Sequence, residues 1–259
     1  MPTLYDTIGD TYGKTRQADQ RIVDRIIELL ELSSGTRILD IGAGTGNYSL
    51  ALAERGFNVT ALEPSTVMSD QAPVHPRVTW LTTSAENLPF ENASFDAAIL
   101  ILSIHHFSDV QRALEEAQRV TQGGRVLIFT YDPSAIDDPW LFHYFPAFRT
   151  QIRKAFPTTE HIAACFGSDY TIEEHPFPLP HDLKDSFAGA AWRTPERYLD
   201  PDFRDGTSAF RQLDSATTEA CLGHLRVDLE SGRCDRTNSE VRELTEYDHG
   251  YNFIVATRN

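Results

Sequence analysis

Cysteine is scarce in this sequence, and long apolar runs are missing from it. Its cysteines are Cys165, Cys221 and Cys234, and this odd, scattered set contains no CxxC pair, so the sequence does not predict a disulfide framework. No apolar stretch approaches the roughly 20 residues that span a bilayer, and the first residues have neither the basic nor the apolar region of a signal peptide. We therefore expect a cytoplasmic protein that does not insert into a membrane.

Basic residues are also few. Lysine and arginine together number 23 against 38 aspartates and glutamates, which gives a formal charge of −15. Such a chain repels nucleic acid and anionic membranes, so neither is an expected partner. The histidines show no metal-ligand spacing such as HExxH, and no metal site is predicted. A small molecule is the expected partner, and the sequence leaves the oligomeric state undetermined.

Hydrophobic periodicity indicates one α/β domain with an elaboration. With 259 residues, 41% of them apolar, the chain is long enough to bury the core of such a domain. Short apolar runs alternate with helical segments, a pattern typical of a parallel sheet whose strands are buried on both faces. The expected elements are a helix at 19–32 that Asp19 can cap, a strand, loop and helix within 36–56, strands at 58–64, 77–83, 95–102 and 124–131, and helices at 65–71 and 109–120.

The character of the sequence changes after Thr130. Residues 131–210 hold 15 of the chain's 27 aromatic residues and show no clean alternation of strands and helices. We interpret this part as a cap grown onto the sheet, with a sixth strand at 168–177 and a seventh at 249–259. The prediction is a doubly wound, Rossmann-like, mostly parallel seven-stranded sheet with an antiparallel last strand and a helical, aromatic-rich cap. Its expected parts are a cofactor-binding core with an N-terminal arm at 1–130, the cap and sixth strand inserted in the same domain at 131–247, and the final core strand at 248–259.

A glycine cluster directly follows the first expected strand. Gly42, Gly44 and Gly46 let the backbone turn sharply and let a ligand approach main-chain atoms. A dinucleotide site usually has G-x-G-x-x-G, but Asn47 stands where that pattern needs its last glycine. Asp40, at the end of the strand, disfavours a pyrophosphate and suits a cationic group. The loop therefore predicts a site for a positively charged nucleoside.

At these residues the sequence resembles the class I S-adenosylmethionine-dependent methyltransferases, especially the small-molecule, methyltransferase type 11 enzymes similar to those of ubiquinone biosynthesis. The resemblance extends over about residues 20–130. It rests on four segments in order, which are ILDIGAGTGNYS, ALEPS, SAENLPF and FDAAILILSIHHF. It implies an enzyme (EC 2.1.1.-) that transfers a methyl group from S-adenosylmethionine to a small acceptor and releases S-adenosylhomocysteine.

The resemblance also assigns roles to individual residues. The glycine loop and Asp40 correspond to the turn beneath the methionine part and ribose of the cofactor, and Glu63 to the carboxylate that accepts both ribose hydroxyls. Tyr12 and Arg16 belong to an N-terminal segment that would fold over the cofactor. The implied cofactor-binding residues are Tyr12, Arg16, Asp40, Gly42, Ala43, Gly44, Gly46, Glu63, Pro64, Ser65, Met68, Ala85, Glu86, Leu102 and Ser103.

Methyl transfer from a sulfonium is an in-line displacement whose leaving group departs neutral, so positioning and desolvation can supply much of the acceleration. A hydroxyl or protonated amine acceptor would gain from a general base. His106, and after it His105, are the candidates for catalysis because they directly follow the fourth expected strand. The aromatic cap favours a flat or apolar acceptor, methylated on O or N. The candidate acceptor-binding residues are Tyr5, His181, Trp192 and Arg193.

The sequence is also compatible with two other functions. The chain could be a non-methylating S-adenosylmethionine-binding protein or a cyclase of the same fold, which would bind S-adenosylhomocysteine but generate none. An NAD(P)-dependent oxidoreductase is the second alternative, and the spacing that ends at Asn47 weighs against it. A thermal-shift comparison of S-adenosylmethionine with NAD and NADP separates the cofactor classes.

Overall fold

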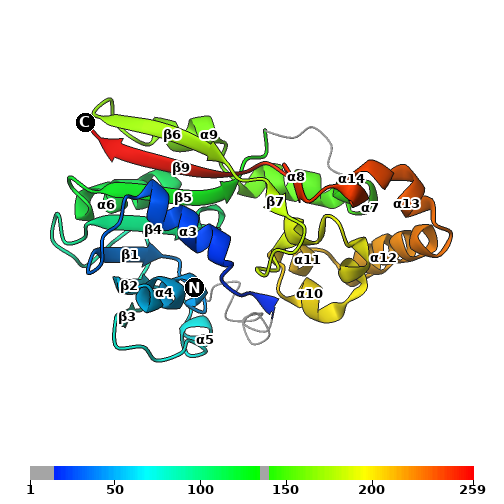
Figure 1. Ribbon diagram of the computed structural model, residues 1–259, viewed down its shortest axis with the longest axis horizontal. Coiled ribbons are helices and arrows are strands. Elements are labelled where there is room, and N and C mark those ends of the chain that lie inside the picture. The colour runs from blue at the N-terminus through cyan, green and yellow to red at the C-terminus, as the bar shows by residue number, and fades with distance from the viewer. Residues whose placement is uncertain (1–14, 135–139) are drawn as a thin grey trace.

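A seven-stranded sheet forms the centre of the molecule (Figure 1). The computed structural model describes residues 15–134 and 140–259. The strand order is β3-β2-β1-β4-β5-β9-β6, and within this sheet β9 runs antiparallel to both of its neighbours while the other pairs are parallel. The predicted mostly parallel sheet with an antiparallel last strand is confirmed. Its strands are β1 (Arg37–Ile41), β2 (Asn58–Leu62), β3 (Val78–Leu81), β4 (Ala97–Ile101), β5 (Arg125–Tyr131), β6 (Tyr170–Pro176) and β9 (Tyr251–Arg258).

Helices cover both faces of this sheet, and each contributes an apolar side to the core. The first of them begins where the Asp19 side chain accepts a hydrogen bond from the backbone N–H of Arg21 at 2.9 Å, and its Ile22 and Ile26 are fully buried against the sheet. In the sheet, all five residues of β4 are buried, as expected of a strand covered on two sides. The helices are α3 (Gln20–Leu29) and α4 (Asn47–Glu54) on one face, α6 (Val110–Val120) and α9 (Thr159–Ala164) on the other, and the short α5 (Thr66–Ser69) after β2.

Two excursions of the chain build a helical cap at the end of the sheet where the parallel strands finish (Figure 1). They pack on one another through a separate cluster of aromatic side chains that includes Phe145, Phe148 and Tyr198. A short ladder of β7 (Leu179–Pro180) and β8 (Glu246–Tyr247) joins the two ends of the second excursion. The cap elements are α7 (Leu141–Tyr144), α8 (Pro146–Ala155), η3 (Ala188–Ala191), η4 (Pro195–Leu199), α10 (Pro201–Asp205), α11 (Ser208–Arg211), α12 (Ser215–Glu230), α13 (Arg233–Thr237) and α14 (Ser239–Glu243).

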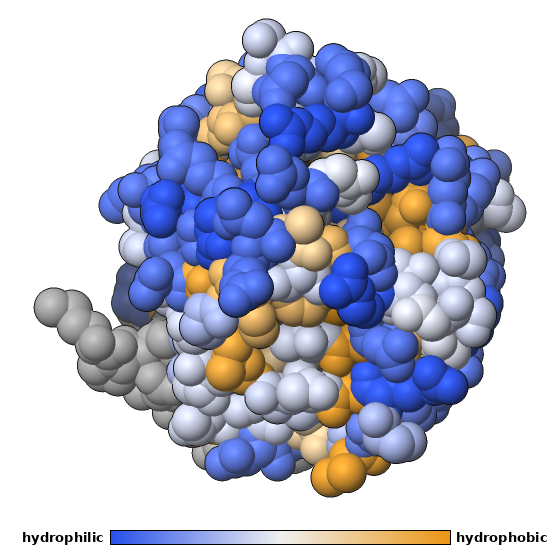
Figure 2. Space-filling view, turned by 90° about the vertical axis from the view of Figure 1, so that its left-hand side faces the viewer, coloured by the Kyte–Doolittle hydropathy of each residue, from blue (hydrophilic) through white to orange (hydrophobic). Residues whose placement is uncertain are grey.

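The end of the sheet away from the cap is largely hydrophilic, with apolar side chains in small separate groups (Figure 2). Among the described residues, no helix has the length and apolar character of a membrane span. In the same part of the chain, no three His, Cys, Asp or Glu side chains are grouped so as to hold a metal ion. Open α/β sheets bind ligands beyond the carboxyl ends of their strands, which is the end that the cap covers here.

Candidate active site

The glycine loop follows β1 in a backbone conformation that residues with a Cβ rarely adopt. Gly42, Gly44 and Gly46 all have positive φ, at 77°, 60° and 79°. A Cβ on Gly42 would lie 2.6 Å from the Cβ of Ser103, and one on Gly46 would lie 2.5 Å from the ring of Trp80. The first and third glycines are therefore fixed by packing as well as by conformation. A Cβ on Gly44 would meet only the Met68 methyl group, at 3.5 Å, so the loop is open at this point.

Glu63 follows β2 and ties its own loop to the glycine loop. Its carboxylate is buried and accepts hydrogen bonds from the backbone N–H groups of Gly44, at 3.0 Å, and Ser65, at 2.9 Å. These two bonds go to different oxygens, and a carboxylate can accept several hydrogen bonds in all. Glu63 therefore links the glycine loop to the loop after β2 at the carboxyl edge of the sheet.

A first cavity of about 270 Å³ opens beside this loop. Its floor is the glycine loop and its sides come from the segments that follow β2 and β4, so it lies at the carboxyl ends of the strands, as a nucleotide site in this architecture should. The lining residues are Arg16, Gly42, Ala43, Gly44, Thr45, Asn47, Tyr48, Glu63, Pro64, Met68, Ile101, Leu102, Ser103, His106, Phe107 and Asp185.

Arg16 covers this cavity from the segment before α3, held by the cap. Its Nε and Nη2 donate to the two oxygens of buried Asp185 at 2.5 and 3.1 Å, a bidentate pair. The hydroxyl of Tyr48 donates to the same carboxylate at 3.0 Å, and the amide of Asn47 donates to the Arg16 carbonyl at 2.9 Å. The predicted role of Arg16 near the cofactor thus has a defined position. Tyr5 and Tyr12 lie outside the described residues.

Asp40 does not form part of the cavity wall. Its buried carboxyl group accepts a hydrogen bond from the Ser49 hydroxyl at 2.6 Å, behind the glycine loop. Burial raises the pKa of Asp40 to about 7, although the Ser49 bond opposes this effect, and the nearby Glu63 charge raises it further. The Asp40 side chain thus contacts α4 from beneath the loop, and its predicted contact with a cationic ligand stays a prediction.

Four further predicted cofactor residues, Gly46, Ser65, Ala85 and Glu86, also lie outside the cavity wall. Gly46 packs against the ring of Trp80. Ser65 is fully buried, and Ala85 packs in the core beside β4. Glu86 is occupied at the start of α6, where one of its oxygens accepts from the Ser108 N–H at 3.0 Å and hydroxyl at 2.8 Å. Burial alone would raise the pKa of Glu86, but the hydrogen bonds from Ser108 and Asp109 outweigh it and the pKa is lowered. The roles predicted for Ser65, Ala85 and Glu86 at the nucleoside stay predictions.

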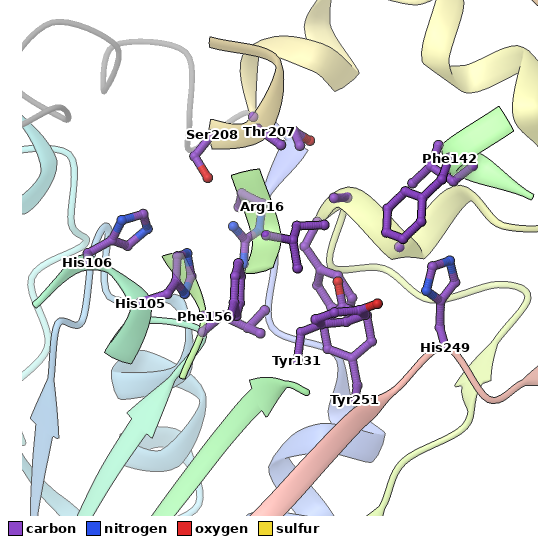
Figure 3. Close-up of a pocket in the computed structure, with 18 residues that line it drawn as sticks. Arg16, His105, His106, Tyr131, Phe142, Phe156, Thr207, Ser208, His249 and Tyr251 are labelled. Carbon is purple, nitrogen blue, oxygen red and sulfur yellow. The ribbon is translucent and has the colours of Figure 1, made fainter. Parts of the chain in front are cut away.

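A second cavity, of about 70 Å³, adjoins the first beneath the cap. Arg16, Leu102 and His106 line both cavities, so they form the boundary between them. Leu102 has φ of 52°, a left-handed conformation that costs free energy in a residue with a Cβ, and its N–H donates to the Phe129 carbonyl at 2.8 Å. Because of this bend after β4, Leu102 and His106 contact both cavities. The remaining wall is mainly aromatic and comes from Tyr131, Phe142, Phe156, Phe187 and Tyr251, with His105, His249 and cap residues such as Thr207 and Ser208 (Figure 3).

The two adjacent histidines predicted as catalytic line the second cavity, in the short helix η2 (Ile104–His106), and only His106 also lines the first. Their ring centroids lie 3.8 Å apart, and His105 stacks on Phe156 at 3.9 Å. Burial lowers the pKa of His106 to about 4, and the Arg16 charge acts in the same direction. Burial also lowers the pKa of His105 well below its usual range. Both imidazoles are therefore neutral at pH 7, and His106 lies where the cavities meet.

The structure does not bring the predicted cap residues to either cavity. Trp192 is fully buried, and its indole N–H donates to the Leu179 carbonyl at 3.0 Å. Arg193 donates to the Arg242 carbonyl at 2.7 Å, and His181 is exposed. Trp192 belongs to the core cluster that packs on the sheet. The cavity lining gives no support to an acceptor-binding role for these three residues, and that role stays a prediction.

Sequence reasoning missed several residues that do line the cavities. At the first cavity these are Thr45, Asn47, Tyr48, Ile101, Phe107 and Asp185. At the second they include Tyr131, Phe156, His249 and Tyr251. A signal for Tyr131, His249 and Tyr251 was present, because the start of an antiparallel last strand must lie at the same edge as the ends of the parallel strands. In the structure Tyr131 and Tyr251 are register partners in β5 and β9.

Comparison with known proteins agrees with this architecture. The family model described as "Methyltransferase domain" matches residues 39–129. Demethylmenaquinone methyltransferase from Paenarthrobacter aurescens is 28% identical over 61% of this chain and 70% of its own length, and the enzyme of that name from Beutenbergia cavernae is 30% identical over 59% and 67%. A crystal structure from Anabaena variabilis, named "Putative methyltransferase from antibiotic biosynthesis pathway", has a TM-score of 0.89 and 43% identity over 94% of this chain and 99% of its own. The chain belongs to the class I S-adenosylmethionine-dependent methyltransferases.

The first cavity of this methyltransferase fits the cofactor that its family implies. The bare Cα of Gly44 leaves room beside the loop, and the buried Glu63 carboxylate offers acceptors for paired hydroxyl groups. Pro64, Met68 and Phe107 supply an apolar wall against which a base can lie. When bound, S-adenosylmethionine supplies an electrophilic methyl group, and the residues shared by the two cavities are the ones at which that group and an acceptor can meet.

Proposed function

We propose that this protein transfers the methyl group of S-adenosylmethionine to an oxygen or nitrogen atom of a small aromatic or heterocyclic metabolite. The cofactor occupies the first cavity and the acceptor the second. The observation that carries the proposal is that two cavities share a wall at Leu102 and His106, one cavity built on the glycine loop and the other lined by aromatic rings. A slot of this kind suits a flat ring system because ring faces and edges pack favourably against one another.

The acceptor cavity also bears on the chemistry of the transfer. His105 and His106 are neutral, so His106 can accept a hydrogen bond from a hydroxyl or amine at the boundary without placing another positive charge beside the sulfonium. A base whose pKa lies near 4 removes a proton poorly at neutral pH. We infer that His106 orients the acceptor and that proximity and exclusion of water supply most of the acceleration.

The residues around the first cavity have corresponding roles in this proposal. Glu63 holds the ribose hydroxyls, Pro64 and Met68 lie against the nucleoside, and Ala43 and Gly44 present main-chain atoms to it. Arg16, held by Asp185, closes the cavity over the cofactor and borders the acceptor. Asp40, Gly46 and Ser65 support the loop from behind.

The direct test is release of S-adenosylhomocysteine. The purified protein is incubated with S-adenosylmethionine and a panel of phenols, hydroxyquinolines and aminoheterocycles, and both S-adenosylhomocysteine and methylated product are measured by mass spectrometry. We expect acceptor-dependent formation of both in equal amounts, and none with the Glu63→Ala variant. Calorimetric binding of S-adenosylhomocysteine without turnover of any acceptor, including a cell extract, would instead favour the non-methylating protein or cyclase. Binding of NAD in place of either sulfur compound would contradict the proposal.

A further inference from the structure

His249 lies in the second cavity and has no role in the function proposed so far. It belongs to the turn between β8 and β9, where Gly250 has φ of 85° and donates its N–H to the Asp248 side chain at 3.0 Å. The Asp248 carboxylate is thus used within the turn. His249 itself is 3% exposed, and neither of its ring nitrogens has a hydrogen-bond partner among the described residues. Buried polar groups in folded proteins are almost always paired, so this imidazole calls for an explanation.

The surroundings of His249 are aromatic. The rings of Tyr131, Tyr247 and Tyr251 lie around it, with centroid separations of 6.5, 5.6 and 6.2 Å. Burial lowers its pKa to about 4, which leaves a neutral ring with one donor and one acceptor nitrogen at physiological pH. His249 therefore offers one hydrogen bond of each kind at the end of the cavity that Tyr131 and Tyr251 separate from His105 and His106.

The position of His249 relative to the methyl-transfer boundary follows from the sheet. His105 and His106 come after β4, Tyr131 ends β5, and His249 and Tyr251 stand at the start of β9. These strands are consecutive in the sheet, so β4 and β9 are two strand spacings, or roughly 10 Å, apart. Figure 3 shows His249 across the cavity from His105 and His106, with Tyr131 and Tyr251 between them.

We propose that His249 binds a second polar group of the acceptor, at the end of the molecule remote from the atom that is methylated. The acceptor class is then a flat ring compound with a hydroxyl, carbonyl or ring N–H at each end, spanning the tyrosine-lined slot. The assignment rests on the proposed function because it takes the second cavity as the acceptor site. It adds a specificity-determining residue that neither the glycine loop nor the adjacent histidines imply.

The test uses isosteric pairs of acceptors that differ only at the remote end. One pair is hydroquinone and 4-methylphenol, and a longer one is 2,6-dihydroxynaphthalene and 6-methyl-2-naphthol. Binding to the complex with S-adenosylhomocysteine is measured by calorimetry, and methylation is measured separately, for the unsubstituted protein, His249→Leu and His249→Gln. His181→Leu serves as the matched control because His181 is exposed and lies outside both cavities.

In at least one pair, we expect the hydroxyl compound to bind about tenfold or more tightly than its methyl counterpart, the effect of one buried hydrogen bond. His249→Leu should abolish this preference and His249→Gln should restore part of it, while affinity for S-adenosylhomocysteine stays unchanged. His249→Leu should also keep or raise the Tm, because it removes an unpaired buried imidazole. Preference that survives His249→Leu, absence of preference in every pair, or a Tm lowered by many degrees would overturn the assignment. Preference without any methyl transfer would support it and contradict the proposed function instead.

Discussion

The two cavities meet at Leu102 and His106 but are built in different ways. The first cavity, to which we assign the cofactor, is built around one glycine loop, which Glu63 supports from 19 residues further along the sequence. The second cavity, to which we assign the acceptor, takes its wall from Arg16, the residues after β4, the end of β5, the cap and the residues at the start of β9. A loop that binds a ligand through its backbone depends on a few glycines, so few substitutions in it leave the ligand bound. A wall of separate side chains can be altered by single substitutions, and each substitution can change which acceptor binds.

The largest effect should come from Gly42→Ala, which disrupts the glycine loop of the first cavity. The new methyl group would lie 2.6 Å from the Cβ of Ser103 in a residue with φ of 77°, so the loop has to move. We expect affinity for S-adenosylhomocysteine to fall on the order of 100-fold or more, about 2.7 kcal/mol. This affinity is measured by calorimetry, and Gly35→Ala is the control. Gly35 has φ of 87° but no atom within 4 Å of a Cβ, so it should cost only about 1 kcal/mol of stability and leave cofactor affinity intact. Equal cofactor affinity in both variants would remove the loop from the site.

Glu63→Gln should have the next largest effect. The amide keeps the size of the side chain but loses a charged acceptor, and hydrogen bonds to charged groups contribute more than neutral ones. We expect the cofactor dissociation constant to rise roughly 10- to 100-fold, with acceptor specificity unchanged. Glu54→Gln on the exposed side of α4 is the control and should bind normally. A change in acceptor preference without a change in cofactor affinity would place Glu63 at the wrong cavity.

This contrast also explains what the sequence could predict. The core strands and the glycine loop follow from contiguous segments, because a buried strand and a tight turn leave a local pattern. The predicted sheet with its antiparallel last strand is confirmed. Glu63 and Met68 were predicted from the resemblance to the methyltransferases, and both line the first cavity. The division of the chain into core and cap at residue 130 remains a prediction.

The acceptor cavity leaves no such local pattern. Trp192 and Phe156 both belong to the aromatic-rich part of the sequence, yet Trp192 is buried in the core cluster that packs on the sheet and Phe156 stacks on His105 at the cavity. Which aromatic residue goes where depends on how two excursions pack on each other, and each excursion contributes to a shared core. Glu86 shows the same limit at a polar residue, since its carboxylate is taken by Ser108 at the start of α6. Motif position alone does not reveal which hydrogen-bond partner a side chain finds.

Phe156→Ala tests the side-chain-built cavity. It removes the ring that stacks on His105 at 3.9 Å and meets Tyr131 edge-on at 5.8 Å. We expect kcat/KM for the acceptor to fall about tenfold, mainly through KM, while cofactor affinity stays within experimental error. Phe90→Ala is a matched control, because Phe90 is half-buried and also packs edge-on, against Phe95, but lies outside both cavities. If Phe156→Ala lowered the affinity for the cofactor as much as the affinity for the acceptor, the two cavities would not bind their ligands independently.

The smallest effect is expected at His106, where the two cavities join. Burial and Arg16 hold the pKa of this imidazole at about 4, so it is neutral from pH 6 upward in the folded protein. Because the folded-state pKa is depressed, the folded state binds fewer protons than the unfolded state between about pH 4 and pH 6.5, and His106 makes stability rise with pH in that window and stay level above it. His106→Gln keeps a hydrogen-bond acceptor but cannot take up a proton, so kcat should fall only about threefold, and the rate should show no inflection near pH 6.5 in either protein. A loss of two orders of magnitude, together with the disappearance of an acidic limb from the rate profile, would show that His106 removes the proton, and that the boundary between the cavities supplies acid–base chemistry as well as position.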